Sequence, residues 1–361
     1  MPSIPALINQ LIRPEILALN AYHVPASAGM VKLDAMENPY LVPASLREKI
    51  AAAVSDAAIN RYPDPSAQAL RQKIRELLQL NDDMEVLLGN GSDELIQLLA
   101  MAVNKPNATL LSVEPSFVMY KMIATFLGMR YVGVPLAADF SLDISAMLAT
   151  IERDQPALVF LAYPNNPTGN VFSSDDIKQI LHAAQGLVVV DEAYYAFAEE
   201  SFVPQLANYP NLLVMRTFSK LGMAGLRLGF LVGDKRWLEQ LEKLRLPYNV
   251  GVLPQLVATK LLEHHDVLLT QAAQIKQDRS NLAQQLSAIT GVQVFASSAN
   301  FLLLRVARAK EIFEGLKQRG VLIKNLHGGH AMLENCLRVT VGTPEENERF
   351  LVAFKECIQQ G

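Results

Sequence analysis

The sequence predicts an α/β fold, with a large domain built on a mainly parallel β-sheet and a smaller α+β domain. Between residues 86 and 232, short apolar runs alternate with longer amphipathic ones, and this alternation is typical of parallel strands joined by helices. After residue 290 a second, shorter set of strand and helix patterns follows. The chain has 361 residues, half of them hydrophobic, which is enough for two domains or one large one.

The expected boundaries divide the chain into three parts. Residues 1–40 form an N-terminal arm, which we expect to pack on the small domain and on a partner subunit, and residues 4–11 within it have the pattern of a short helix. Residues 41–250 form the large domain and residues 251–361 the small one. The sequence contains no internal repeat and no low-complexity linker.

The large domain begins with two amphipathic helices. Between them, Pro63 and Pro65 keep the loop extended and on the surface. Strands and helices then alternate, and Ser173 is suited to cap one of the helices. In chain order, the expected helices are 46–59, 67–80, 95–103, 116–127, 144–151 and 174–182, and the expected strands are 86–88, 109–113, 131–134, 158–162, 187–190, 212–215 and 228–232.

Beyond residue 233, long helices lead into a shorter pattern of strands and helices. The expected helices are 236–244, 254–289, 310–318 and 344–359, and the expected strands are 292–295, 301–306, 321–323 and 337–341. This order, with few helices between the strands, is typical of an α+β domain.

Composition argues against several kinds of partner. The formal net charge is −4 and the chain has no basic run, so nucleic-acid binding has no electrostatic support. No apolar run approaches the roughly 20 residues of a membrane span. His264 and His265 are adjacent on a polar helix face, and His327 and His330 flank two glycines in an expected loop. Neither spacing is typical of ligands, so we expect no metal.

Cysteine usage and the N-terminal sequence indicate the compartment. Cys336 and Cys357 are the only cysteines, so we expect no disulfide framework, and a reducing compartment fits. The N-terminus lacks the basic segment and apolar core of a secretory signal. We therefore expect a cytoplasmic protein.

Residues 211–233 carry the strongest chemical signal, because Lys220 lies between two apolar runs. Burial lowers the pKa of a lysine, and the free amine is then a nucleophile toward an aldehyde. Ser219 offers a hydroxyl and Arg227 a guanidinium fork to an anion. A nucleophilic amine beside a phosphate cradle indicates pyridoxal 5′-phosphate (PLP) as the cofactor. The alternative is an ordinary strand–loop–strand with a surface lysine.

A glycine-rich turn at residues 89–94 opens the helix expected at 95–103. Free N–H groups and the helix dipole make such a terminus an anion site, although Gly-Ser-Asp also begins many helices for capping alone. The turn is not the fingerprint of a nicotinamide-binding dehydrogenase, because Glu94 stands where the third glycine is needed.

Polar residues follow the apolar strands, at the edge where ligands bind in parallel sheets. Asp191 follows one such strand. A carboxylate there would keep a pyridine nitrogen protonated, whereas the alternative is a helix cap or turn. Asn166 and Tyr194 could each bond the phenolic oxygen of PLP. Phe117 could stack on its ring, with a core position as the alternative.

The block Ser-Lys-x-Gly-x-x-Gly-x-Arg-x-Gly at residues 219–229 resembles the lysine signature of fold-type I PLP-dependent aminotransferases. Its order after the Asn-Pro-Thr-Gly and Asp-x-x-Tyr blocks is similar to that of class I and II aminotransferases, and the resemblance spans nearly the whole chain. It implies Lys220, Asp191 and Tyr194 as catalytic residues, with PLP bound to Lys220 as a Schiff base. The contacts that it implies are Asp191 with the ring nitrogen, Asn166 and Tyr194 with the ring oxygen, and Gly91, Ser92, Asp93, Ser219 and Arg227 with the phosphate.

Within this class, the chain resembles the histidinol-phosphate aminotransferases. The segments that carry this resemblance are 37–39, 60–63, 89–94, 246–249 and 336–342. It implies transamination of L-histidinol phosphate with 2-oxoglutarate, giving imidazole-acetol phosphate and glutamate in histidine biosynthesis. It also implies a homodimer with shared active sites, because the family tyrosine at the position of Tyr62 reaches the cofactor phosphate of the other subunit.

Four residues are expected at the substrate: Tyr22, Asn38, Lys324 and Arg338. Arg338 matches the family's anion-binding arginine. Lys324 departs from the family, in which a second arginine is frequent, and lysine keeps the charge but loses the bidentate fork. An aromatic amino-acid aminotransferase and a threonine-phosphate decarboxylase are therefore alternatives. A PLP-binding regulator without turnover is another, but the sequence shows no basic helix-turn-helix extension.

Overall fold

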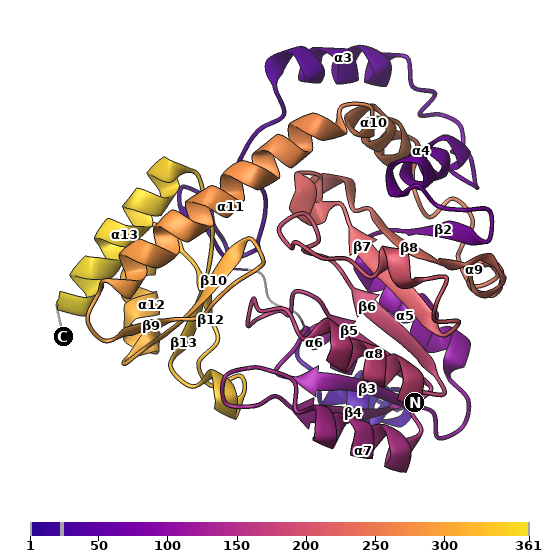
Figure 1. Ribbon diagram of the computed structural model, residues 1–361, viewed down its shortest axis with the longest axis horizontal. Helices are drawn as coiled ribbons and strands as arrows, with labels where there is room; N and C mark the ends of the chain where they lie inside the picture. The colour runs from indigo at the N-terminus through magenta and orange to yellow at the C-terminus, as the bar shows by residue number, and fades with distance from the viewer. Residues whose placement is uncertain (1, 22–24, 360–361) are drawn as a thin grey trace.

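The computed structural model describes residues 2–21 and 25–359, in which seven strands form one large sheet (Figure 1). The strand order is β2-β8-β7-β6-β5-β3-β4. The strands are β2 (Met84–Gly89), β3 (Thr109–Glu114), β4 (Arg130–Pro135), β5 (Leu158–Ala162), β6 (Leu187–Asp191), β7 (Leu212–Thr217) and β8 (Gly229–Asp234). Neighbours from β7 to β4 are parallel, whereas β8 is antiparallel to β7 and β2. The prediction of a mainly parallel sheet is confirmed.

Successive side chains of each strand enter two different hydrophobic cores. Val188 and Val190 of β6 pack in one core, and Val189 packs in the other. Strands β5 and β6 are buried at every position, which explains their unbroken apolar sequences. The helices that contribute to the first core include α4 (Gln68–Leu78), α7 (Ile144–Asp154), α8 (Ser174–Ala183) and α10 (Val252–Leu262), and those of the second are α5 (Ser92–Val103), α6 (Val118–Leu127) and α9 (Lys235–Glu242).

A second sheet occupies the C-terminal part of the chain (Figure 1). Its order is β12-β13-β10-β9, and all its neighbouring pairs are antiparallel. The strands are β9 (Val292–Val294), β10 (Phe301–Val306), β12 (Lys324–Asn325) and β13 (Cys336–Thr340), and the helices that share its core are α11 (His265–Ser287), α12 (Ala309–Gln318) and α13 (Pro344–Gln359). This arrangement agrees with the α+β pattern expected from the sequence.

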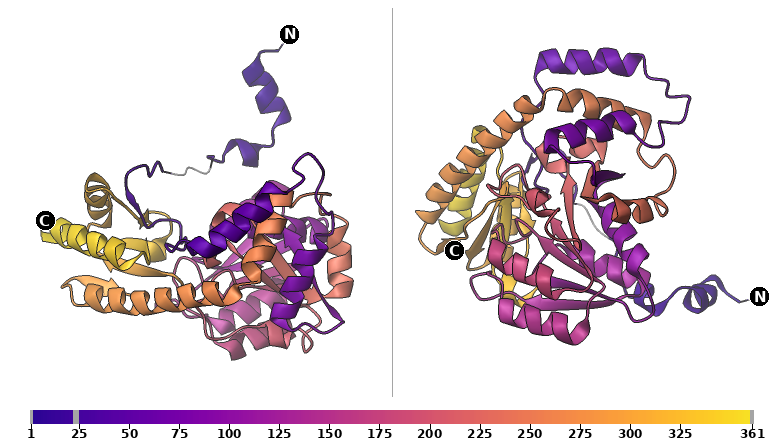
Figure 2. Two further views of the ribbon diagram at one scale, coloured as in Figure 1. Left: turned by 90° about the horizontal axis from the view of Figure 1, so that it is seen from above. Right: turned by 45° about the vertical axis from the view of Figure 1, so that its right-hand side comes forward.

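The N-terminal segment meets this C-terminal part through a short parallel pair, β1 (Val31–Lys32) with β11 (Val321–Leu322). Helix α1 (Ile4–Leu11) has the predicted bounds and extends away from the rest of the chain (Figure 2). None of its residues is buried. The remaining helices of this segment are α2 (Pro14–Leu17), which contacts α6, and α3 (Ala44–Ser55), which contacts α10.

The long helix expected at residues 254–289 is wrong, because the chain forms α10 and α11 with a break between them. His264 has φ −121° and ψ 43°, outside the helical region, so His264 and His265 do not share a helix face. Apolar residues continue with helical spacing on both sides of the break, and periodicity alone does not reveal it. The strand expected at 321–323 forms as β11 and ends at Leu322, and a separate strand, β12, which was not expected, follows it in a different sheet.

Some features are absent from the described residues. Within 2–21 and 25–359, no helix has both the length and the apolar character needed to cross a membrane. In the same ranges, no group of three or more His, Cys, Asp and Glu side chains is arranged to hold a metal ion. Cys336 and Cys357 are buried and form no disulfide.

Candidate active site

A cavity of about 420 Å³ lies beyond the carboxyl ends of β5, β6 and β7, where Ala162, Asp191 and Thr217 line it. Ligands bind at this edge in open parallel sheets. Residues 35–37 of the N-terminal segment also line the cavity. The remaining lining residues are Ser92, Asp93, Phe117, Pro164, Asn166, Ala193, Tyr194, Ser219, Lys220, Ala224, Gly225 and Arg227.

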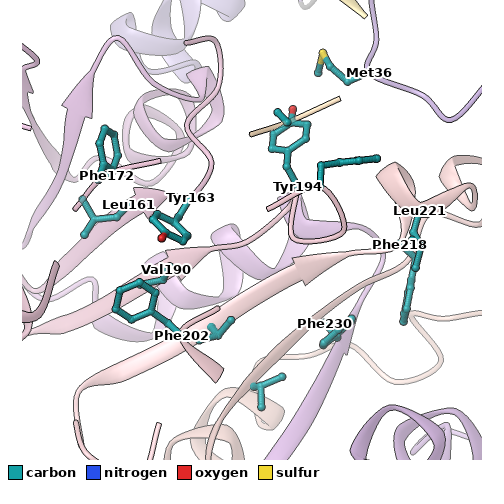
Figure 3. Close-up of a cluster of buried hydrophobic side chains, with 14 of the residues drawn as sticks. Met36, Leu161, Tyr163, Phe172, Val190, Tyr194, Phe202, Phe218, Leu221 and Phe230 are labelled. Carbon is teal, nitrogen blue, oxygen red and sulfur yellow. The ribbon is translucent and has the colours of Figure 1, made fainter. Parts of the chain in front are cut away.

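Lys220 lies in the connection between β7 and β8. Phe218 and Leu221 on either side of it are 2% and 1% exposed (Figure 3), and their burial fixes this short segment while Lys220 lines the cavity. The lysine Nζ donates a hydrogen bond of 3.0 Å to the carbonyl of Ala35. Burial, and after it the cation of Arg338, lower the pKa of Lys220 to about 8. Its amine therefore loses a proton more easily than an ordinary lysine does.

Asp191 ends β6 and is 4% exposed. Its Oδ2 accepts a 2.7 Å hydrogen bond from the hydroxyl of Tyr120, and its Oδ1 accepts a 3.1 Å bond from the backbone N–H of Ala193. Burial raises the pKa of Asp191 to about 7, although both hydrogen bonds favour the carboxylate. A buried acid with this pKa can share a proton with a basic nitrogen placed beside it.

The start of α5 and the chain after β7 meet at one end of the cavity. Helix α5 begins at Ser92 without a side-chain cap, so its first N–H groups point toward a potential anion. Arg227 Nη2 lies 3.7 Å from Asp93 Oδ2. A Cβ on Gly91, whose φ is +83°, would stand 2.8 Å from Arg227 Nη2, and a Cβ on Gly229 would stand 2.6 Å from the Ser92 nitrogen. Both glycines are therefore required for this close packing.

Three more predicted residues line the same cavity. The ring of Phe117 packs with that of Tyr120 at a centroid distance of 5.6 Å, and the ring of Tyr194 packs with that of Phe301 at 5.2 Å. Burial raises the pKa of the Tyr194 hydroxyl, which therefore remains protonated and can donate a hydrogen bond. Asn166 is 8% exposed.

Arg338 of the C-terminal sheet connects to the cavity through Asn166, and Lys324 lies beside Arg338 on the neighbouring strand. Arg338 Nη1 donates to Asn166 Oδ1 at 2.6 Å, and Nη2 donates to the carbonyl of Asp34 at 2.9 Å. Lys324 is the cross-strand neighbour of Arg338. Burial, and then the Arg338 cation, lower the pKa of Lys324. The two cations are thus close enough to influence one another, as a shared anion pocket requires.

Six predicted residues are not among the described residues that line the cavity. Gly91 and Arg338 lie next to lining residues and Lys324 lies beside Arg338, as given above, and the other three are Tyr62, Asn38 and Tyr22. Tyr62 is 79% exposed, and its ring stacks on that of Tyr248 with centroids 4.4 Å apart, beside a different cavity of about 410 Å³. Asn38 donates a 2.9 Å hydrogen bond to Gln271. Tyr22 lies outside the described residues.

Sequence reasoning missed Tyr120, the side chain that donates to Asp191. It follows Phe117 by three positions at the start of α6, a spacing that brings side chains to one face of a helix, and this spacing was the available signal. Met36 and Thr217 also line the cavity. Nothing in their residue types or local pattern indicated a site.

Comparison with known proteins relates this site to a family. The family model "Aminotransferase class I and II" matches residues 28–354. Histidinol-phosphate aminotransferase 2 of Cupriavidus pinatubonensis is 56% identical over 98% of this chain and 98% of its own length. Histidinol-phosphate aminotransferase 1 of Ralstonia nicotianae is 51% identical over 99% of this chain and 97% of its own.

A solved structure gives the same fold. The histidinol-phosphate aminotransferase from Sinorhizobium meliloti, in complex with pyridoxal-5′-phosphate, covers 97% of this chain and 98% of its own, with a TM-score of 0.87. Its sequence identity is 24%, so this likeness concerns the fold alone. Together with the family match, it identifies the chain as a member of the aminotransferase class I and II family, with the fold-type I architecture.

Proposed function

We propose that the chain is a PLP-dependent aminotransferase that transfers the amino group of L-histidinol phosphate to 2-oxoglutarate, giving imidazole-acetol phosphate and glutamate in histidine biosynthesis. The observation that carries this proposal is the position of Lys220, whose pKa is lowered and which shares one cavity with Asp191 and Arg227. Relatives named histidinol-phosphate aminotransferases, from 56% to 46% identical, support the substrate. A structure named L-threonine-O-3-phosphate decarboxylase is 22% identical and supports only a common fold.

The residues of the cavity fit PLP. The uncapped start of α5, the hydroxyl of Ser219 and the guanidinium of Arg227 suit a phosphate dianion. Asp191 is a buried acid that suits a basic ring nitrogen, and Lys220 offers the amine for the aldehyde. When bound, PLP supplies that aldehyde, with which amines condense, and a ring that accepts electrons from the substrate carbon.

Lys220 carries the proton transfer in this proposal. Its Nζ would take the proton from the substrate carbon as a general base and then, as a general acid, donate it to C4′, the aldehyde carbon of PLP. With a pKa of about 8, more of the amine is unprotonated near neutral pH than in an ordinary lysine. The hydrogen bond to the carbonyl of Ala35 directs the amine within the cavity.

Asn166 and Tyr194 would orient the ring of a bound PLP through its oxygen. Arg338 uses the side-chain carbonyl oxygen of Asn166, so the amide N–H₂ of Asn166 is left to donate to an acceptor in the cavity. The Tyr194 hydroxyl stays protonated, because burial raises its pKa, and it donates to the same oxygen. Phe117, which lines the same cavity, would contact the face of the ring.

Arg338 and Lys324 bind the substrate's anion, and Tyr22 and Asn38 complete the substrate site. Two adjacent cations suit a phosphate dianion better than a single carboxylate, which one arginine satisfies with two hydrogen bonds. Their cross-strand pairing between β12 and β13 supports a common pocket.

A homodimer with shared sites and a cytoplasmic location belong to the same proposal. Tyr62 is proposed to complete the cofactor phosphate site of the partner subunit. Its support is the exposure of large apolar side chains near it in sequence or contact: Ile59 is 75% exposed, Tyr62 79% and Tyr248 41%. Exposed apolar patches of this kind mark interaction surfaces. The absence of a bond between the two cysteines is consistent with a reducing compartment.

The test is a competition between amino donors. The purified holoenzyme receives L-histidinol phosphate, phenylalanine or O-phosphothreonine with 2-oxoglutarate, and glutamate and CO₂ are measured. We expect kcat/KM for histidinol phosphate to exceed that for phenylalanine by about a hundredfold or more. Preference for phenylalanine would indicate an aromatic aminotransferase, and CO₂ release from phosphothreonine a decarboxylase. Binding of PLP without turnover of any donor would indicate a regulator.

A further inference from the structure

Tyr120 is a buried polar side chain to which the proposed reaction assigns no task. It lies on α6, is 0% exposed, and its hydroxyl donates a 2.7 Å hydrogen bond to Asp191 Oδ2. The ring stacks on Phe160 of β5 with centroids 4.6 Å apart and planes 7° apart, and it packs edge-on to Phe117. Packing against both rings fixes the direction in which the hydroxyl points.

The surroundings of Asp191 make this single donor important. Burial disfavours the carboxylate, and the acidic groups of Asp93 on α5 and Glu192 next in the chain act in the same direction. The Tyr120 hydroxyl and the Ala193 backbone N–H act against them. Among the described residues, Tyr120 is the side chain whose hydrogen bond to Asp191 favours the ionised form. Removing the Tyr120 hydroxyl would leave the backbone N–H of Ala193 as the remaining described hydrogen-bond donor to the Asp191 carboxylate.

Each carboxylate oxygen has two lone pairs, and the observed contacts use one on each oxygen. The carboxylate can therefore accept a further N–H from a ligand while both existing bonds remain. With Tyr120 on Oδ2 and Ala193 on Oδ1, rotation of the carboxyl group about its bond to the chain would break both contacts. The two hydrogen bonds thus fix the direction in which the Asp191 carboxylate can accept a hydrogen bond from a ligand in the cavity, before any ligand binds.

We propose that Tyr120 is a positioning residue for the cofactor: its hydroxyl holds the Asp191 carboxyl group in the one orientation that receives the pyridine N–H of PLP. This inference rests on the proposed use of PLP and adds to it a residue that does not touch the cofactor. Tyr120 acts on the ring only through Asp191.

The first experiment measures the dissociation constant of PLP from the apoenzyme by absorbance titration, so it does not depend on turnover. Tyr120→Phe keeps the packed ring and removes only the hydroxyl. A hydrogen bond to a charged group is lost, and we expect PLP to bind about ten- to a hundredfold more weakly. An unchanged dissociation constant would overturn the proposal.

The chain offers a matched control in Tyr40. Its hydroxyl donates a 2.8 Å hydrogen bond to Oδ2 of Asp278, a carboxylate that is 6% exposed. Tyr40→Phe therefore removes the same kind of contact, and we expect its PLP affinity to remain within about twofold of wild type. An equal loss of affinity in both variants would mean that Tyr120 has only a general structural effect.

The second experiment repeats Tyr120→Phe in an Asp191→Asn background. If the hydroxyl acts through the carboxylate, its removal changes the PLP dissociation constant there by less than about twofold. A full loss in this background would overturn the proposal. Comparing Asp191→Asn with the double variant also tests the proposal if Tyr120→Phe alone does not fold. In the Asp191→Asn background, removing the Tyr120 hydroxyl leaves no carboxylate without its hydrogen-bond donor.

The outcome is separable from that of the proposed function. Wild-type protein that does not bind PLP at all would refute the function and the inference together. Protein that binds PLP with the predicted pattern of affinities, but does not use histidinol phosphate, would refute the substrate and leave the role of Tyr120 supported. The reverse result, turnover without any Tyr120 effect on PLP affinity, would refute the role alone.

Discussion

Two sides of the same cavity are built in different ways. On the strand side, Asp191 and Tyr120 are almost fully buried in the large sheet and its helices, with a hydrogen bond between them. On the other side, Arg338 of β13 reaches a carbonyl of Asp34 in the N-terminal segment, and its neighbour Lys324 is only partly buried. The first side suits chemistry common to every substrate. The side formed by Arg338 and Lys324 joins distant parts of the chain. We expect changes of substrate to be accommodated most easily on this side.

Replacing Lys220 by Ala should have the largest effect, because it removes the reactive amine from the strand side. We expect multiple-turnover transamination to fall by about 10⁴-fold or more, while PLP still binds through Ser219, Arg227 and Asp191. The measurement is steady-state turnover together with borohydride reduction of the wild-type holoenzyme, which should attach the cofactor to one peptide. Attachment to a different lysine would remove Lys220 from this role.

Asp191→Asn should come next, since it removes the charge of the strand side and keeps its shape. We expect kcat to fall by about 10²- to 10³-fold, and by the same factor for histidinol phosphate and for glutamate, because the carboxylate serves both half-reactions. Single-turnover kinetics with each donor measures this. Near-normal turnover would show that Asp191 is only a structural residue.

The pair Lys324→Ala and Arg338→Ala examines the other side of the cavity. Lys324→Ala should raise KM for histidinol phosphate about tenfold and leave glutamate nearly unchanged, because a second cation matters most to a phosphate dianion. Arg338→Ala should impair both donors, and Lys324→Arg, the matched control, should retain histidinol phosphate. Equal effects of Lys324→Ala on both donors would favour an aromatic aminotransferase.

Hybrid dimers test whether Tyr62 of one subunit completes the active site of the other subunit. Lys220→Ala and Tyr62→Phe subunits, each inactive or weakened alone, should regain activity when mixed, because one site of the hybrid then has both native residues. The recovery should reach at most about half of the wild-type activity per hybrid dimer. Confirmed re-pairing without any recovery would show that Tyr62 acts within its own subunit or not at all.

The smallest expected effect is on the stability of the apoprotein. The pKa of Lys220 falls from 10.5 to about 8 on folding, so the unfolded chain binds more protons than the folded one between these values, and stability rises with pH there. Below about pH 8 both states are protonated and the cost of burying the charge is complete. Lys220→Met should therefore melt higher than wild type at pH 7, and the difference should narrow by pH 9.5. A constant difference would show that the folded amine titrates normally.

The sequence predicted some parts of the fold and the site better than others. Buried parallel strands have continuous apolar sequences, so β5, β6 and β7 were recognisable, and Asp191 and Lys220 could be located by their positions next to these runs. The contact of Tyr120 with Asp191 joins residues 71 positions apart, and no local pattern reveals it. The break at His264 was equally hidden, because helical spacing continues across it. The exposed position of Tyr62 agrees with the surface loop predicted from Pro63 and Pro65.

The pairing of β2 with β8 bears on how the protein is made. Met84 lies opposite Asp234, so β2 leaves the ribosome long before its neighbour in the sheet exists. Contacts between such distant parts of a chain form slowly, and an unpaired strand edge is prone to aggregate. Every fragment that ends before β8 lacks Gly229, which packs against the start of α5. The end of the cavity that is proposed to bind the cofactor phosphate is therefore completed late in synthesis, and a nascent chain has no native form of it.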